Sequence, residues 1–165
     1  MPFYSEKMPA DYRKQTRKAT NSDVKDVQRL VSEVLKEYGL IPDPSVIDSD
    51  IADIEKAYLK AGGMFYVVEM DNMIIGCAGL FRIDELTCEL RKMYIYPVFR
   101  GRGIGRFLLH QLISDAKRLG YRKVTLETAS VLKEAINMYK ANGFKPYSAG
   151  NICSRCDQAF MLELV

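Results

Sequence analysis

Apolar residues recur along this chain with two different periods, and the changes of period divide it into helices and strands. Apolar positions three or four residues apart, typical of helices, occupy 24–35, 51–58, 104–119 and 132–141. Alternating or continuously apolar runs, typical of strands, occupy 14–19, 64–70, 73–81, 87–96, 123–128, 144–147 and 158–164. The resulting order is β-αα-βββ-αβ-αββ, without a repeat or an internal linker, and it predicts one mixed α/β domain.

Local turn and capping signals agree with these boundaries. Thr20 begins a Thr-Asn-Ser-Asp segment that places an acid three residues after an acceptor side chain, a pattern that starts helices. Gly39 and Gly120 follow the last apolar positions of two helical segments, where glycine commonly ends a helix. Asp71 and Asn72 separate two strand segments and are typical of a two-residue hairpin turn.

The first residues differ in character from the rest of the chain. Residues 1–13 carry charges and no apolar run, so we interpret them as an N-terminal extension rather than a secretory signal. Residues 14–165 form the predicted domain. No stretch approaches the roughly 18 consecutive apolar residues of a membrane-spanning helix. We therefore expect a cytoplasmic protein with no membrane partner.

The four cysteines point to no metal site. Cys77 and Cys88 lie in apolar strand segments, where a free thiol acts as a small hydrophobic side chain. Cys153 and Cys156 form a C-x-x-C pair, but the further ligands of a structural zinc site are missing. We expect a reduced protein with incidental thiols.

The charge of the chain is balanced overall and uneven locally. The total of 24 Lys and Arg against 21 Asp and Glu gives +3, too little to indicate a nucleic-acid-binding protein. Residues 91–123, however, hold nine basic residues and one acid, a net charge of +8, which leaves −5 for the remainder. This basic window predicts a binding site for an anion.

A glycine-rich loop lies inside the basic window, between a predicted strand and a predicted helix. It reads Arg100-Gly101-Arg102-Gly103-Ile104-Gly105-Arg106. Glycines let a backbone approach a ligand closely, and a helix start offers unpaired N–H groups to a pyrophosphate. The Walker pattern is absent, and the dinucleotide pattern G-x-G-x-x-G fails because Arg106 stands at its last glycine. RNA binding is disfavoured because the interleaved aromatics of an RNA platform are missing.

These residues resemble the GNAT superfamily of N-acetyltransferases. The loop matches the family signature [RQ]-x-x-G-x-[GA], and residues 135–144 match its A-x-x-[LM]-Y-x-x-x-G-F helix. The resemblance covers Arg17 to Val165. It implies an α/β fold with a central, mostly antiparallel sheet, a splayed fourth and fifth strand, and about four flanking helices.

The strand before the loop independently predicts an irregularity. Leu90, Met93 and Ile95 are the natural inward-facing residues, yet Leu90 and Met93 have opposite parity. A β-bulge near Arg91 and Lys92 restores the alternation. In the family such a bulge splays this strand from its neighbour and makes room for the pantetheine arm of acetyl-CoA.

The resemblance implies acetyl-CoA as cosubstrate and assigns its contacts. Backbone groups of Met93, Tyr94 and Ile95 pair with the pantetheine. N–H groups of the loop hold the pyrophosphate: Arg100, Gly101, Arg102, Gly103, Ile104, Gly105 and Arg106. The basic window is therefore interpreted as the nucleotide end of the site. A family Asn that contacts the cofactor is replaced by Leu132, so that contact is not carried over.

The implied reaction is direct attack of a primary amine on the thioester in a ternary complex, which needs one proton removed and one supplied. Tyr139 stands at the family position of the acid. Glu89 is the first candidate for the base and Glu127 the second, although either carboxylate can instead position the acceptor or join a salt bridge, and a water chain can serve as base. His110 falls on a polar helix face and is interpreted as a surface residue.

Several alternatives remain open from the sequence. A non-catalytic module that senses CoA or acetyl-CoA has the same fold. The acceptor is a small-molecule or peptide amine, and the acids Asp43, Asp48 and Asp50 are either attractors of a cationic acceptor or ordinary loop residues. A homodimer is an option that no feature of the sequence selects.

Overall fold

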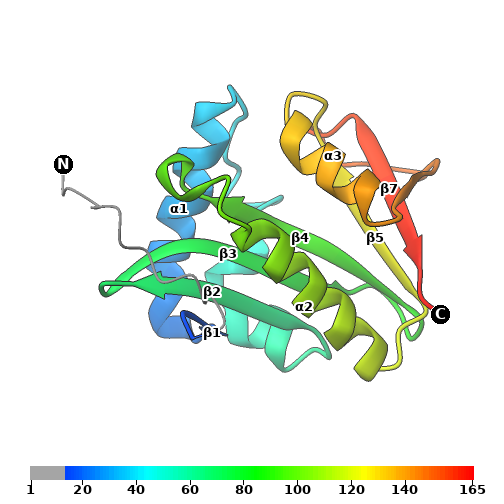
Figure 1. Ribbon diagram of the computed structural model, residues 1–165, viewed down its shortest axis with the longest axis horizontal. Helices are drawn as coiled ribbons and strands as arrows, with labels where there is room; N and C mark the ends of the chain where they lie inside the picture. Colours follow the sequence, from blue (N-terminus) through cyan, green and yellow to red (C-terminus); the bar gives the residue numbers. More distant parts are fainter. Residues whose placement is uncertain (1–13) are drawn as a thin grey trace.

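The computed structural model describes residues 14–165 and is organised around a seven-stranded mixed sheet (Figure 1). The strand order is β1-β2-β3-β4-β5-β7-β6, and every neighbouring pair is antiparallel except β4 with β5, which is parallel. The strands are β1 Thr16–Lys18, β2 Met64–Met70, β3 Met73–Arg82, β4 Thr87–Ile95, β5 Lys123–Thr128, β6 Lys145–Pro146 and β7 Gln158–Glu163. The predicted single α/β fold with a mostly antiparallel sheet is confirmed.

Helices cover both faces of this sheet. The α-helices are α1 Val24–Glu37, α2 Ile104–Arg118 and α3 Lys133–Ala141. Helix α1 packs on one face, whereas α2 and α3 lie against the other (Figure 1). The helix predicted over 51–58 is instead two short turns, a 3₁₀ turn at Ser49–Ala52 and a π turn at Glu55–Leu59. Between them Asp53 accepts a hydrogen bond from the backbone N–H of Lys56, and such capping favours a break in the helix.

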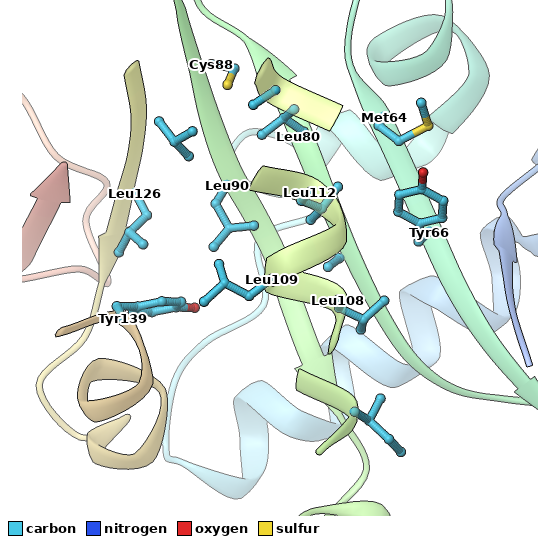
Figure 2. Packing of buried hydrophobic residues seen from close by; sticks show 14 of the residues in the cluster. Met64, Tyr66, Leu80, Cys88, Leu90, Leu108, Leu109, Leu112, Leu126 and Tyr139 are labelled. Atoms are coloured by element: carbon cyan, nitrogen blue, oxygen red, sulfur yellow. The ribbon is translucent and has the colours of Figure 1, made fainter. Parts of the chain in front are cut away.

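The core is divided by the sheet into two apolar clusters. Leu108, Leu109 and Leu112 of α2 lie over Leu80 and Leu90 of β3 and β4 (Figure 2). On the opposite face, the apolar stripe of α1 packs with residues of β2, β3 and the two short turns. Alternation along a strand directs successive side chains to opposite faces of the sheet, and so to one cluster or the other.

The predicted hairpin and bulge are both present. Asp71 and Asn72 have φ values of +49° and +61°, the left-handed conformation of a tight hairpin turn. In the β3–β4 ladder, Gly79 pairs with Arg91 but Cys77 pairs with Tyr94, so β4 contains an extra residue there. Because of this bulge, Met93 and Ile95 pack on the same core cluster as Leu90.

Strands β4 and β5 separate soon after they meet. Their pairing covers Thr87 with Lys123, Cys88 with Val124 and Glu89 with Thr125, and it stops there. Both strands continue beyond this point, β4 to Ile95 and β5 to Thr128, but they no longer pair with each other. The splayed pair that the family resemblance implied is therefore present.

The C-x-x-C pair differs from the prediction. Cys153 and Cys156 form a disulfide, with Cα atoms 5.3 Å apart, so they are not the free thiols expected. The turn between them, closed by a hydrogen bond from the Cys156 N–H to the Cys153 carbonyl, brings the two side chains together. Cys77 and Cys88 are free and buried, as predicted.

The remaining predictions concern the N-terminal extension, membrane-spanning helices and metal sites. The N-terminal extension over residues 1–13 lies outside the described residues. Within residues 14–165, none of the helices has the length and apolar character needed to cross a membrane. In the same range no group of His, Cys, Asp and Glu side chains could hold a metal ion.

Candidate active site

A cavity of about 530 Å³ lies where β4 and β5 separate. It is bounded by the bulged end of β4, the end of β5, the start of α2, one side of α3, and parts of the segments 38–47 and 153–156. Twelve of the thirteen predicted site residues line it: Glu89, Met93, Tyr94, Ile95, Arg100, Gly101, Gly103, Ile104, Gly105, Arg106, Glu127 and Tyr139. Arg102, the remaining one, is exposed beside it.

The glycine loop presents bare backbone to this cavity. Gly101 and Gly103 have φ values of +75° and +87°, which favour glycine, and a Cβ placed on either would meet no atom within 4 Å. Gly103 is the N-cap of α2, so the first N–H groups of the helix have no partner within the helix. Open space, free N–H groups and the positive end of the helix dipole together suit a phosphate group.

The side chain of Arg100 has another role than the sequence indicated. It forms a bidentate ion pair with Glu37 at 2.7 and 2.8 Å, and it also donates to the hydroxyl of Tyr38 at 3.0 Å. Its Nε donates to the carbonyl of Ile95 at 2.9 Å. Arg100 therefore ties the end of α1 to the loop, and the exposed Arg106 is left to offer charge at the cavity.

Tyr139 extends from α3 into the region between β4 and β5. Its ring is buried, and Figure 2 shows its hydroxyl directed toward Leu109 and Leu90. Within the described chain, no residue forms a hydrogen bond with this hydroxyl. Burial, together with the nearby Tyr94, raises the pKa of Tyr139 well above its usual value. The phenol is therefore protonated at neutral pH and can donate a proton.

The two candidate carboxylates lie on the same face of the sheet in different surroundings. Glu89 pairs across the strands with Thr125, two residues from Glu127. Glu89 is engaged by the Arg91 guanidinium. Glu127 accepts a hydrogen bond from the backbone N–H of Cys153 at 2.7 Å, and no side-chain cation within residues 14–165 pairs with it.

The surroundings of Glu127 favour its neutral form. Burial raises its pKa, and the charge of Glu89 adds to that effect. The Cys153 N–H and the charge of Arg91 oppose the rise without cancelling it. A carboxyl group with a raised pKa in a cavity is a candidate for proton exchange with a bound ligand.

A buried ion cluster that the sequence did not reveal forms the wall next to these carboxylates. Arg155 makes a bidentate pair with Asp48, both distances 2.7 Å, and Lys92 Nζ lies 3.1 Å from Asp48 and 3.2 Å from Asp50. Burial alone would raise the pKa of Asp48, but Arg155, the Asp43 N–H and Lys92 lower it to about 2. Asp48 and Asp50 are thus already paired with cations.

Two further predicted residues have the positions that the sequence indicated. His110 is exposed on α2, where its Nε2 lies 2.7 Å from Oδ1 of Asn142, and it does not line the cavity. Leu132 is the N-cap of α3 and does line the cavity, so an apolar side chain stands where a polar contact would otherwise be offered.

A sheet split between β4 and β5, with the glycine loop at one end of the split and acids at the other, is the arrangement expected of acyl-CoA-dependent transferases. The model of the acetyltransferase (GNAT) family matches residues 28–144. The chain belongs to this family and is an N-acetyltransferase.

Relatives agree in sequence and in fold. An uncharacterized N-acetyltransferase of Escherichia coli K12, YjgM, is 32% identical over 134 residues, which cover 78% of this chain and 80% of the relative. A GNAT-family acetyltransferase of Staphylococcus aureus Mu50 superposes with a TM-score of 0.85 at 23% identity, covering 91% and 98% of the two chains. The structure of yncA from Salmonella typhimurium with acetyl-CoA superposes with a TM-score of 0.72 at 21% identity, covering 91% and 93%.

Proposed function

We propose that this N-acetyltransferase takes its acetyl group from acetyl-CoA and transfers it directly to a primary amine within a ternary complex. The observation that carries the proposal is the position of Glu127. Its carboxylate has a raised pKa and no cationic partner within residues 14–165, and it lines the same cavity as the glycine loop and Tyr139. A single cavity thus holds an anion-binding backbone, a proton donor and a proton acceptor.

The residues present fit acetyl-CoA. The open backbone at Gly101 and Gly103 accommodates a pyrophosphate against the first turn of α2, with Arg106 at the rim. Beyond Glu89, the edge of β4 that faces β5 has no strand partner and offers strand-like backbone around Met93 and Tyr94 to the pantetheine arm, whereas the carbonyl of Ile95 already accepts from Arg100. The related yncA has been solved with acetyl-CoA in the same fold. Acetyl-CoA supplies an activated thioester, so that a C–N bond forms while the C–S bond breaks.

Glu127 is the proposed general base. An incoming ammonium must lose a proton before attack, and a carboxylate whose pKa is raised above its usual value is better suited to remove it. Glu89, the first candidate from the sequence, is held by Arg91 and is better placed to orient its neighbours. The unpaired charge of Glu127 also gives the acceptor ammonium a binding partner.

Tyr139 is the proposed general acid. The departing sulfur accepts a proton, and a buried phenol with a raised pKa carries one at all physiological pH values. Its hydroxyl is directed between the two splayed strands, the region offered to the thioester end of the cosubstrate (Figure 2).

The proposal is tested by measuring CoA release from acetyl-CoA across a panel of alkylamines, amino acids, polyamines and peptides. We expect release only with an amine present, and a fall in kcat of about 10²-fold in Tyr139→Phe with little change in acetyl-CoA affinity. Tyr121→Phe is the matched control, because its hydroxyl bonds the Gly62 carbonyl away from the cavity. Acetyl-CoA binding without turnover of any amine would support the sensor alternative, and wild-type turnover by Tyr139→Phe would remove its role as acid.

A further inference from the structure

The segment between β6 and β7 closes one side of the cavity and is fixed mainly at its second half. Arg155 is held by its bidentate pair with Asp48. Asp157 accepts hydrogen bonds from the N–H and hydroxyl of Ser130 at 2.8 and 2.6 Å, and its own N–H donates to Thr128 at 3.0 Å. Residues 155–157 are therefore anchored to the rest of the protein at three points.

The first half of the same segment has much weaker attachment. Of the described residues, 148–152 form no hydrogen bond or ion pair with the remainder of the protein, and they are largely exposed. Cys153 follows them, and its position is set by the disulfide to Cys156 and by the hydrogen bond from the Cys156 N–H at 2.9 Å. The disulfide is thus a second covalent link, in addition to the backbone, between Cys153 and the anchored residues.

Cys153 is also the residue that contacts Glu127. Its backbone N–H donates to Oε1 of that carboxylate at 2.7 Å, and both residues line the cavity. We propose that the Cys153–Cys156 disulfide is a positioning element for catalysis, which holds the Cys153 N–H on the carboxylate of Glu127. This inference rests on the proposed role of Glu127 as base.

Reduction provides a direct way to release this contact. A dithiol transfers two electrons and two protons to the disulfide, giving two cysteine thiols while the dithiol itself becomes a disulfide. Cys153 is then joined to the anchored half by the intervening backbone and by the hydrogen bond from the Cys156 N–H, and the weakly attached residues 148–152 can carry its own N–H away from Glu127. Reduction would thereby lower the activity on the acidic limb of the pH profile.

The sign of the effect follows from the groups around Glu127. An N–H that donates to a carboxylate stabilises the charged form, so its loss raises the pKa of Glu127 further. The other charged or titratable groups facing it are Glu89 and Arg91 on β4 and Tyr147 beside β6, and reduction of the disulfide changes none of their charges. We expect the acidic limb of the pH–kcat profile to move upward by about one pH unit. Activity on the alkaline plateau should change by less than about threefold.

The experiment compares the disulfide-bonded enzyme with the same enzyme after dithiothreitol, following the loss of thioester absorbance over pH 5 to 9. Intact mass after alkylation of the native protein verifies the two states. The buried thiols of Cys77 and Cys88 are shielded, so reduction should add two reactive thiols. The double variant C153S/C156S is the matched control, which should show the shifted profile with or without dithiothreitol. An identical profile for oxidised and reduced wild-type enzyme would overturn the inference, as would a native protein in which the disulfide does not form.

A failure of the proposed base role gives a different result. The acidic limb of the pH–kcat profile is assigned to Glu127 if it disappears in Glu127→Gln. A limb that persists in Glu127→Gln belongs to another group and contradicts the base role itself. A limb that disappears in Glu127→Gln but does not move on reduction contradicts only the positioning by the disulfide. If C153S/C156S does not fold, the reduction of wild-type enzyme alone decides between these outcomes.

Discussion

The two ends of the cavity are built from different materials. The end assigned to the cosubstrate consists mainly of backbone from one continuous stretch, residues 93–106, with glycines in left-handed conformations at the start of α2. The end assigned to the acceptor consists of charged side chains from distant parts of the chain. Asp48 and Arg155, for example, meet across 107 residues. A backbone-built site is specified locally, whereas a side-chain-built site exists only after the whole chain has folded.

The largest expected effect comes from removing the proposed base. Glu127→Gln keeps the size of the side chain and its hydrogen bond from Cys153 but cannot accept a proton at neutral pH. We expect kcat to fall by 10²- to 10⁴-fold, the usual range for a general base, with the KM for acetyl-CoA nearly unchanged. Glu89→Gln, which removes the partner of Arg91, should cost about tenfold or less. Steady-state kinetics with saturating acetyl-CoA measure both, and the reverse ranking would return the base role to Glu89.

A second effect concerns stability at the acceptor end. Asp48→Asn leaves Lys92 and Arg155 buried with one carboxylate fewer, and breaking such a buried pair costs about 3 kcal/mol. Urea unfolding of the variant measures this loss. The exposed pair of Arg17 with Glu69 is the comparison, because Glu69→Gln should cost less than about 1 kcal/mol. Equal losses at the two positions would show that the buried cluster does not contribute more than a surface pair.

A smaller, more selective effect is expected at the cosubstrate end. Gly103→Val places a branched side chain in a left-handed conformation and beside the open backbone, so we expect a KM for acetyl-CoA raised about tenfold and a stability loss of about 2 kcal/mol. Gly120, with φ +92° beyond the other end of α2, is the control. Gly120→Val should lose similar stability without affecting KM. A normal KM in Gly103→Val would place the pyrophosphate elsewhere.

The cosubstrate end could largely be predicted from the sequence. The opposite parity of Leu90 and Met93 predicted the bulge, and glycine spacing at a strand–helix junction predicted the loop, because both depend on neighbouring residues. The exception is the basic window. Lys92 pairs with acids of the acceptor wall and Arg100 with Glu37, so part of the excess charge serves structure rather than the nucleotide. Counting charges in a window does not reveal their partners.

The acceptor end could not be predicted in the same way. Sequence spacing indicated that Asp48 was either free for a cationic acceptor or an ordinary loop residue, whereas it forms the centre of an ion cluster. The preference for Glu89 over Glu127 also depended on position along a strand, and the structure distinguishes them by their partners. Arg91 neutralises one carboxylate, and only a backbone N–H reaches the other.

The ion pair between Arg155 and Asp48 has a consequence for redesigning this enzyme. It joins the two segments that border the acceptor end, one before β2 and one before β7, and both side chains are largely buried. If a loop exchange with a relative replaced only one of these segments, either Arg155 or Asp48 would remain as a buried charge without its partner. The two segments are thus one exchangeable module, and a change of substrate preference should be sought by transplanting them as a pair.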